Sequence, residues 1–140
     1  MDFLQQFVII SISLVVGLST LFALTIYLRN KKLKEEKNLI PIFSEIGGGR
    51  IGFFNLSYPF VRFSLYKDFL VFSSLFSNII YYDKIKKINK HFSVFAQGIE
   101  VLTYRNNKHG RVIFFTFNNA NELKGLINRL VIDYNNHTKD

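Results

Sequence analysis

Cysteine and tryptophan are absent from this chain of 140 residues, which also has only one methionine and two prolines. Without cysteine there are no disulfide bonds, no thiolate metal ligands and no thiol nucleophile, which fits a protein of a reducing compartment. The three histidines, His91, His109 and His137, lie far apart in the sequence, and no acidic residue accompanies them at a ligand spacing. The sequence therefore predicts no metal site.

Acidic residues are few, with 10 Asp and Glu against 18 Lys and Arg, so the formal net charge is +8. We find no carboxylate pair and no nucleophile motif, so we predict neither a catalytic site nor a bound cofactor. Gly47-x-Gly49-x-x-Gly52 matches the dinucleotide fingerprint by letter. That fingerprint needs a helix after it, whereas residues 51–54 are typical of a strand. The glycines therefore predict a flexible hinge at the start of the folded domain.

Charge is missing altogether between residues 3 and 28. The positions that follow carry five basic residues, Arg29, Lys31, Lys32, Lys34 and Lys37. Because a hydrocarbon core of about 30 Å needs about 20 apolar residues in a helix, residues 1–30 are predicted to form a transmembrane anchor. The alternative, a cleaved signal peptide, would need a basic start, a shorter apolar core and a small-residue cleavage site.

The basic cluster also predicts the orientation of the chain in the cell membrane. Lys and Arg beside a span are retained on the cytoplasmic side, so the N-terminus should lie outside and the remaining domain in the cytoplasm. The same five basic residues are expected to contact lipid headgroups. Ser13 and Gly17 have the small-x-x-x-small spacing that lets two membrane helices dimerise, although small residues are common in such spans anyway.

Beyond the anchor, we predict a basic linker at residues 31–45, a single folded domain at 46–134 and a polar tail at 135–140. The domain is expected to be mainly β, within the α+β class. Alternating apolar residues and turn signals predict seven strands, at residues 50–55, 60–65, 69–73, 77–82, 88–95, 99–105 and 111–117.

The apolar period changes from two to 3.6 after the last predicted strand. Asn119-x-x-Glu122 resembles a capping box at the start of a helix. One apolar stripe follows at helical spacing, formed by Leu123, Leu126, Ile127, Leu130, Val131 and Tyr134. An amphipathic helix has to cover apolar surface, and the sheet is the candidate.

Seven short strands and one C-terminal helix, in this order, resemble the pleckstrin-homology-like (PH-like) superfold. The local sequence is similar to bacterial PH-like and GRAM-like domains in VRFSLYKDFLVF (61–72), IIYYDKIKKI (79–88), GIEV (98–101) and the stretch from FTF (115–117) to Leu126. The likeness covers about residues 50–131. It implies a partly open barrel capped by the helix and a binding module instead of an enzyme.

In phosphoinositide-binding members of that superfold, basic residues surround the loop between the first two strands. The corresponding predicted loop here, residues 55–59, contains no Lys or Arg. The densest basic group of the predicted domain lies elsewhere, at Lys84, Lys86, Lys87 and Lys90. These four lysines are either a contact for an anionic surface or a solvated rim of the barrel.

Together these features predict a membrane-anchored, non-enzymatic binding or scaffold module, which contacts a protein partner or anionic lipid at the cytoplasmic face. Nucleic acid is not expected as a partner of a membrane-bound chain. Two alternatives stay open. One is an accessory subunit of a membrane enzyme or complex, and the other is a structural membrane protein that self-associates through its span and a sheet edge.

Overall fold

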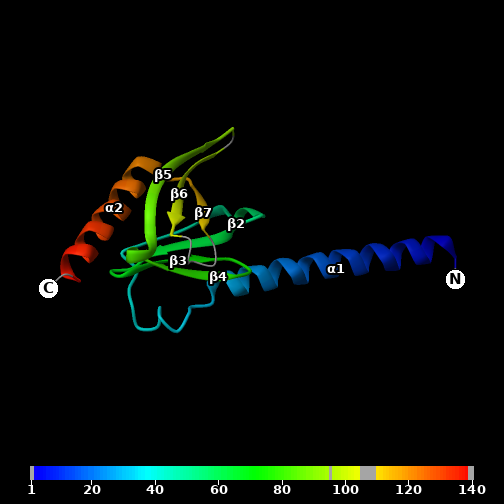
Figure 1. The fold of residues 1–140 in the computed structure, drawn as a ribbon. Helices are drawn as coiled ribbons and strands as arrows, with labels where there is room; N and C mark the ends of the chain where they lie inside the picture. Colours follow the sequence, from blue (N-terminus) through cyan, green and yellow to red (C-terminus); the bar gives the residue numbers. More distant parts are fainter. Residues whose placement is uncertain (1, 95, 105–109, 139–140) are drawn as a thin grey trace.

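The computed structural model describes residues 2–94, 96–104 and 110–138. A long helix projects from a domain made of one curled sheet and a second helix (Figure 1). The elements follow each other as α1 Phe3–Asn30, β1 Phe43–Ile51, β2 Phe54–Leu65, β3 Phe69–Ser73, β4 Ser77–Tyr81, the short 3₁₀ helix η1 Tyr82–Lys84, β5 Ile85–Ser93, β6 Ala96–Thr103, β7 Arg111–Thr116 and α2 Ala120–His137.

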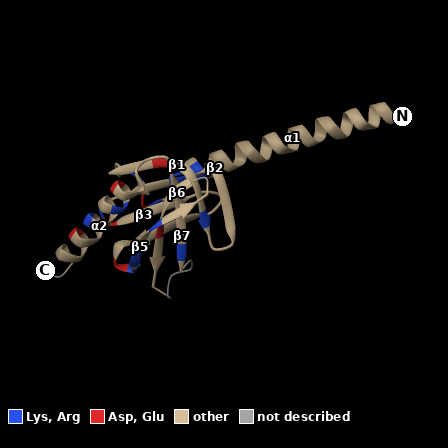
Figure 2. Cartoon of the chain, turned by 90° about the horizontal axis from the view of Figure 1, so that it is seen from above, with Lys and Arg blue, Asp and Glu red and all other residues tan. Residues whose placement is uncertain are grey.

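Helix α1 is long and apolar enough to cross a membrane, and its most apolar window has a mean hydropathy of 2.5 with none of its residues buried. Two of its hydroxyl side chains, those of Thr20 and Thr25, donate from Oγ1 at 2.8 Å to the carbonyl one turn back. These two threonines therefore add little unsatisfied polar surface to the helix. Figures 1 and 2 show α1 and α2 at opposite ends of the domain.

The seven strands form one antiparallel sheet in the order β4-β3-β2-β1-β7-β6-β5. Strong curling turns this sheet into a half-barrel whose inner face holds the core (Figure 1). Aromatic rings fill the centre, with Phe63 stacked on Phe114 at 4.8 Å between centroids and Phe72 edge-on to Phe114 at 6.3 Å. The predicted fold class, a mainly β sheet of seven strands with one C-terminal helix, is confirmed.

Helix α2 packs against the sheet through its predicted stripe. Leu123 and Ile127 are buried, and the other four residues of the stripe pack on the core around them. The predicted cap at Asn119 is also present, although its side chain accepts from the backbone N–H of Asn121 at 3.0 Å and not from that of Glu122.

The prediction for the first strand was wrong. Strand β1 covers residues 43–51, and its turn into β2 lies at Gly52 and Phe53, inside the predicted first strand. Gly47, Gly48 and Gly49 are buried within β1 and are not a hinge. A Cβ on Gly47 would overlap the carbonyl oxygen of Phe115, so these glycines allow β1 to pass close to its neighbours.

Other boundaries also differ from the predicted ones. Strand β2 continues through the residues 57–59 that were expected to interrupt it, and a bulge between Gly47 and Gly49 absorbs the irregular register. Strand β5 begins at Ile85, so the lysines of the predicted basic group lie in or beside that strand, not before it. The start of β1 at Phe43 also falls inside the predicted linker.

Candidate binding surfaces

A buried ion pair joins the segment after α1 to the sheet. The Glu36 side chain is fully buried (0% exposed), and its two carboxylate oxygens lie 2.9 Å from the two terminal nitrogens of the Arg62 guanidinium. The hydroxyl of Tyr66 donates to the same carboxylate at 2.9 Å, and the backbone N–H of Leu33 donates at 2.8 Å. Lys34 and Lys37 are closer to Glu36 in the sequence, yet its partner is Arg62 on β2.

The pKa values in this cluster follow from burial and from these partners. Burial by itself would raise the pKa of the Glu36 carboxyl, but the hydrogen bonds from Arg62, Leu33 and Tyr66 outweigh it and hold the pKa below its ordinary value. Burial, together with the Glu36 carboxylate, raises the pKa of Tyr66 to about 12. The carboxylate is therefore ionised and fully engaged at neutral pH, which indicates a structural role.

Helix α1 is attached to β2 by a second set of contacts. Arg29 is buried, and its guanidinium donates to the carbonyl of Pro59 at 2.5 Å. Arg62 in turn donates from Nε to the carbonyl of Arg29 at 3.2 Å. Two turns earlier, the ring of Phe22 packs edge-on against Phe60 with 5.4 Å between centroids. The last turns of α1 are thus part of the domain.

Arg29 is thus engaged with the domain, unlike the other four residues that were predicted to contact lipid headgroups. The remaining four, Lys31, Lys32, Lys34 and Lys37, are exposed in the segment after α1. Within the described ranges none of the four takes part in an ion pair. The predicted contact with lipid headgroups therefore rests on these four lysines.

The four lysines of the predicted surface contact differ in their surroundings. Lys84, in η1, is paired with Asp83 at 2.7 Å, and this hydrogen bond raises the pKa of Lys84. Lys86 and Lys87 are exposed on β5, while Lys90 lies further along the strand with its Nζ 4.8 Å from the centroid of the Phe92 ring. Because η1 packs against α2, Lys84 lies at the end of the domain away from α1 (Figure 1).

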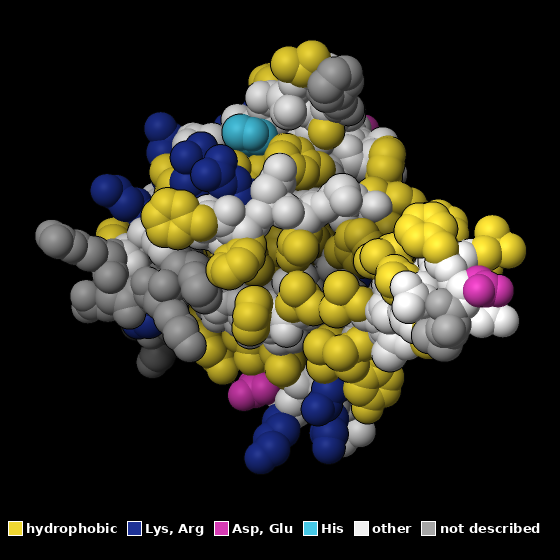
Figure 3. Space-filling model, turned by 90° about the vertical axis from the view of Figure 1, so that its right-hand side faces the viewer, with side chains coloured by type: hydrophobic (Ala, Val, Ile, Leu, Met, Phe, Trp, Pro, Cys, Tyr) yellow, Lys and Arg dark blue, Asp and Glu magenta, His cyan; other side chains and the backbone are white. Residues whose placement is uncertain are grey.

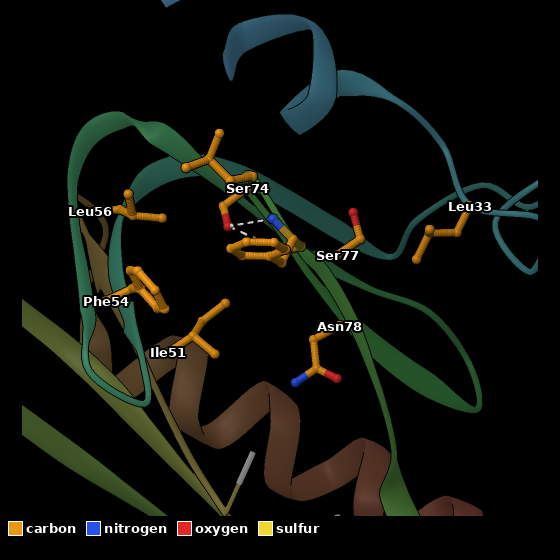
Figure 4. Close-up of a pocket in the computed structure, with 9 residues that line it drawn as sticks. Leu33, Ile51, Phe54, Leu56, Ser74, Ser77 and Asn78 are labelled. Carbon is orange, nitrogen blue, oxygen red and sulfur yellow. Dashed lines mark hydrogen bonds between the residues drawn. The ribbon is translucent and has the colours of Figure 1, made fainter. Parts of the chain in front are cut away.

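An apolar groove of about 620 Å³ lies between the β1–β2 turn and the β3–β4 turn (Figure 4). It is lined by Leu33, Ile51, Phe54, Leu56, Ser74, Leu75, Phe76, Ser77 and Asn78. Both of its serines are already engaged, since Ser74 bonds to the backbone of Phe76 and Ser77 to the hydroxyl of Ser73. The groove therefore offers a mainly apolar ligand surface, with the Asn78 amide as its other polar side chain.

Phe54, Leu75 and Phe76 line this groove, and Phe53 precedes Phe54 in the β1–β2 turn. We call these four exposed apolar residues the tip cluster. Phe53 is 97% exposed and Phe76 62% exposed, and the rings of Phe54 and Phe76 lie 6.1 Å apart. Figure 3 looks at the end of the domain from which α1 projects, and hydrophobic side chains cover much of the face beside that helix. Sequence reasoning missed this surface because it placed Phe53 and Phe54 inside a strand.

Comparison with protein-family models and with curated protein sequences gives no match. Solved structures do match. The Vps36 N-terminal PH domain aligns with a TM-score of 0.54 at 13% identity, over 76% of this chain and 87% of that domain. The fold is PH-like. The C-terminal domain of an unknown protein from Leishmania infantum aligns with a TM-score of 0.55 at 19% identity, over 70% of this chain and 89% of the other.

The comparison confirms the PH-like resemblance at the level of the fold. The likeness to GRAM-like domains and the bacterial origin stay predictions. In this PH-like domain the loop between the first two strands is the tight turn at Gly52 and Phe53, not residues 55–59. This turn contains no Lys or Arg. Arg50, which precedes it, donates from Nε to the carbonyl of Gly52 at 3.1 Å.

Proposed function

We infer that this chain is a membrane-anchored PH-like binding module without chemistry of its own. Helix α1 spans the cell membrane once and holds the domain at the cytoplasmic face, where the domain contacts a protein partner or the anionic lipid surface. The observation that carries this proposal is an apolar helix with an exposed stretch long enough to cross a membrane, joined to a fold that typically serves as a non-enzymatic binding domain.

The exposed surface of α1 supports the anchor. Large apolar side chains surround the helix from Phe3 to Leu24, and Figure 2 shows no charged residue on the part that projects from the domain. Such a surface is unfavourable in water and matches the hydrocarbon interior of a bilayer, where a helix satisfies its own backbone groups.

The contacts between α1 and the domain favour a permanent anchor and not a signal peptide that is cleaved. Phe22 packs on Phe60, and Arg29 bonds to Pro59 and Arg62. A signal peptide has no need to pack against the protein that it delivers, whereas a permanent anchor gains a fixed direction from such contacts.

The exposed lysines after α1 support the cytoplasmic placement. Lys31, Lys32, Lys34 and Lys37 are exposed within a short segment beside the proposed span, and Asp2 stands at its other end. Basic residues in this position are retained on the cytoplasmic side.

A binding role is favoured over an enzymatic one by the use of the buried polar groups. In the part of the chain that the structure describes, Glu36 is the one buried carboxylate, and it is engaged with Arg62 and Tyr66. An accessory subunit of a membrane enzyme remains compatible with this role. Self-association through Ser13 and Gly17 is a further alternative, since both are on the projecting part of α1.

Because the chain has no cysteine, its topology can be measured with single introduced thiols. We expect Asp2→Cys to react with a membrane-impermeant maleimide in intact cells, and Thr138→Cys to react only after the membrane is permeabilised. Alkaline carbonate should leave both variants in the membrane pellet. Release by carbonate, or the reverse labelling pattern, would contradict the proposal.

A further inference from the structure

We propose that the tip cluster lies in the interfacial layer of the bilayer that α1 crosses, so that the domain is seated on lipid through its β1–β2 and β3–β4 turns. The occupant of this apolar surface is the membrane itself. The inference rests on the proposed function, because it takes α1 as the membrane span.

The depth of the domain follows from the length of α1. At a rise of 1.5 Å per residue, about 20 residues cross a hydrocarbon core of about 30 Å. Charged Asp2 belongs outside this core, so the core ends no earlier than residue 22, and Phe22 is the residue that contacts Phe60 on β2. The domain therefore begins no further from the bilayer than the end of the hydrocarbon. Tilting the helix shortens its reach and brings the domain closer still.

The direction of the domain follows from the joint at its base. Arg29 bonds to Pro59, and Glu36 bonds to Arg62, which fixes α1 against β2. With α1 fixed, the β1–β2 and β3–β4 turns lie at the end of the domain from which α1 projects (Figure 1). This end has to face the bilayer if α1 crosses it.

The chemistry of the tip cluster fits that position. Phe53, Phe54 and Phe76 are aromatic, and the interfacial layer is where aromatic side chains gather in membrane proteins. Contiguous exposed apolar surface is uncommon on a soluble domain and marks an interaction site. The four free lysines after α1 and Arg50 beside the turn supply positive charge that complements anionic headgroups.

The absence of tryptophan makes this inference measurable in the full chain. We would introduce one tryptophan at a time, as Phe53→Trp and Phe76→Trp in the tip cluster. Ile132→Trp, at an exposed position on α2, is the matched control, and Leu14→Trp reports on the span. Each variant would be reconstituted into vesicles of phosphatidylcholine and phosphatidylglycerol. Phosphatidylcholine brominated at a shallow or a deep acyl position then quenches tryptophan fluorescence at the corresponding depth.

We expect Phe53→Trp and Phe76→Trp to lose most of their emission to the shallow bromines, while Ile132→Trp keeps its emission. Leu14→Trp should be quenched by the deep bromines. Phe53→Trp suffices if the second variant misfolds, because Phe53 is almost fully exposed and has no packing to lose.

The two proposals fail in different ways. If Leu14→Trp is quenched and the tip variants are not, α1 spans the bilayer and the tip inference alone is overturned. Tip emission that is blue-shifted but insensitive to bromine overturns it as well, because the surface is then covered by protein, such as a second copy of the chain. If Leu14→Trp is not quenched, the proposed span fails, and this inference fails with it.

Discussion

At the scale of single residues, the pairing of Glu36 with Arg62 decides how the end of α1 meets the sheet. A buried ion pair stabilises a fold only when its geometry is good and its remaining hydrogen bonds are satisfied. Both conditions hold here, since the pair is bidentate and the carboxylate also accepts from Tyr66 and the backbone of Leu33. Removing one partner leaves a buried charge without compensation.

Glu36→Gln is therefore expected to lower the free energy of unfolding by about 3 kcal/mol, because Arg62 would stay buried without a counter-charge. Its neighbour provides the control. Glu35 is exposed, so Glu35→Gln should change stability by less than about 0.5 kcal/mol. Urea unfolding of the full chain in detergent micelles, followed by circular dichroism, measures both.

The difference in unfolding free energy between wild type and Glu36→Gln should depend on pH. The pKa of Glu36 is lowered in the fold, so its ionised form stabilises the native state above the ordinary carboxyl pKa of 4.5. This contribution is lost as the pH falls below that value and the carboxylate is protonated. The gap between wild type and Glu36→Gln should therefore shrink in acid, and a gap that stays constant with pH would rule out the charge as its cause.

At the scale of the element, β1 depends on its glycines. This strand pairs with β2 on one side and β7 on the other, at the centre of the sheet. The backbones of the sheet come close enough at Gly47 that a side chain would meet the carbonyl of Phe115 and the ring of Phe114. The run of glycine, which weakens most strands, is here required by packing.

Gly47→Ala should destabilise the domain by about 1–3 kcal/mol, because the added methyl group overlaps backbone that cannot move aside. Gly125→Ala in α2 is the matched control, since nothing lies within 4 Å of its added Cβ. It should raise stability by up to about 1 kcal/mol, through the better helix propensity of alanine. Thermal unfolding of both variants measures whether their stability changes have opposite signs. Equal stability changes would contradict this account of β1.

At the scale of the whole molecule, α1 and the sheet are one body instead of an anchor on a flexible tether. Contacts extend from Phe22 to Glu36, so the predicted linker includes residues that the domain needs. If α1 spans the bilayer as proposed, a rigid joint fixes which end of the domain faces the membrane. This is the basis for placing the tip cluster at the lipid surface.

Two fragments of the chain should differ in stability because of these contacts. A fragment that begins at Arg29 keeps Glu36 and should unfold cooperatively in solution. One that begins at Leu39 lacks Glu36 and the rest of the segment that contacts Arg62 and Tyr66, so we expect its free energy of unfolding to be lower by about 3 kcal/mol. Comparable unfolding curves for the two fragments would show that the segment after α1 is a simple linker.

Local patterns were sufficient to predict much of the fold. The absence of charge over residues 3–28 predicted α1, alternation predicted most strands, and the stripe from Leu123 to Tyr134 predicted the buried face of α2. Each of these signals lies within one segment of the chain. The first strand failed because glycine is a local turn signal, and its packing against Phe114 and Phe115 cannot be read locally.

The amino-acid sequence by itself determined the apolar helix, the order of strands and helix, and the excess of positive charge, because these depend on neighbouring residues. Only the tertiary structure decided which groups meet over long separations: Glu36 with Arg62, Phe22 with Phe60, and the two turns that form the tip cluster. Such contacts arise when the sheet curls and α1 packs on it. The candidate binding surface is therefore a property of the folded chain.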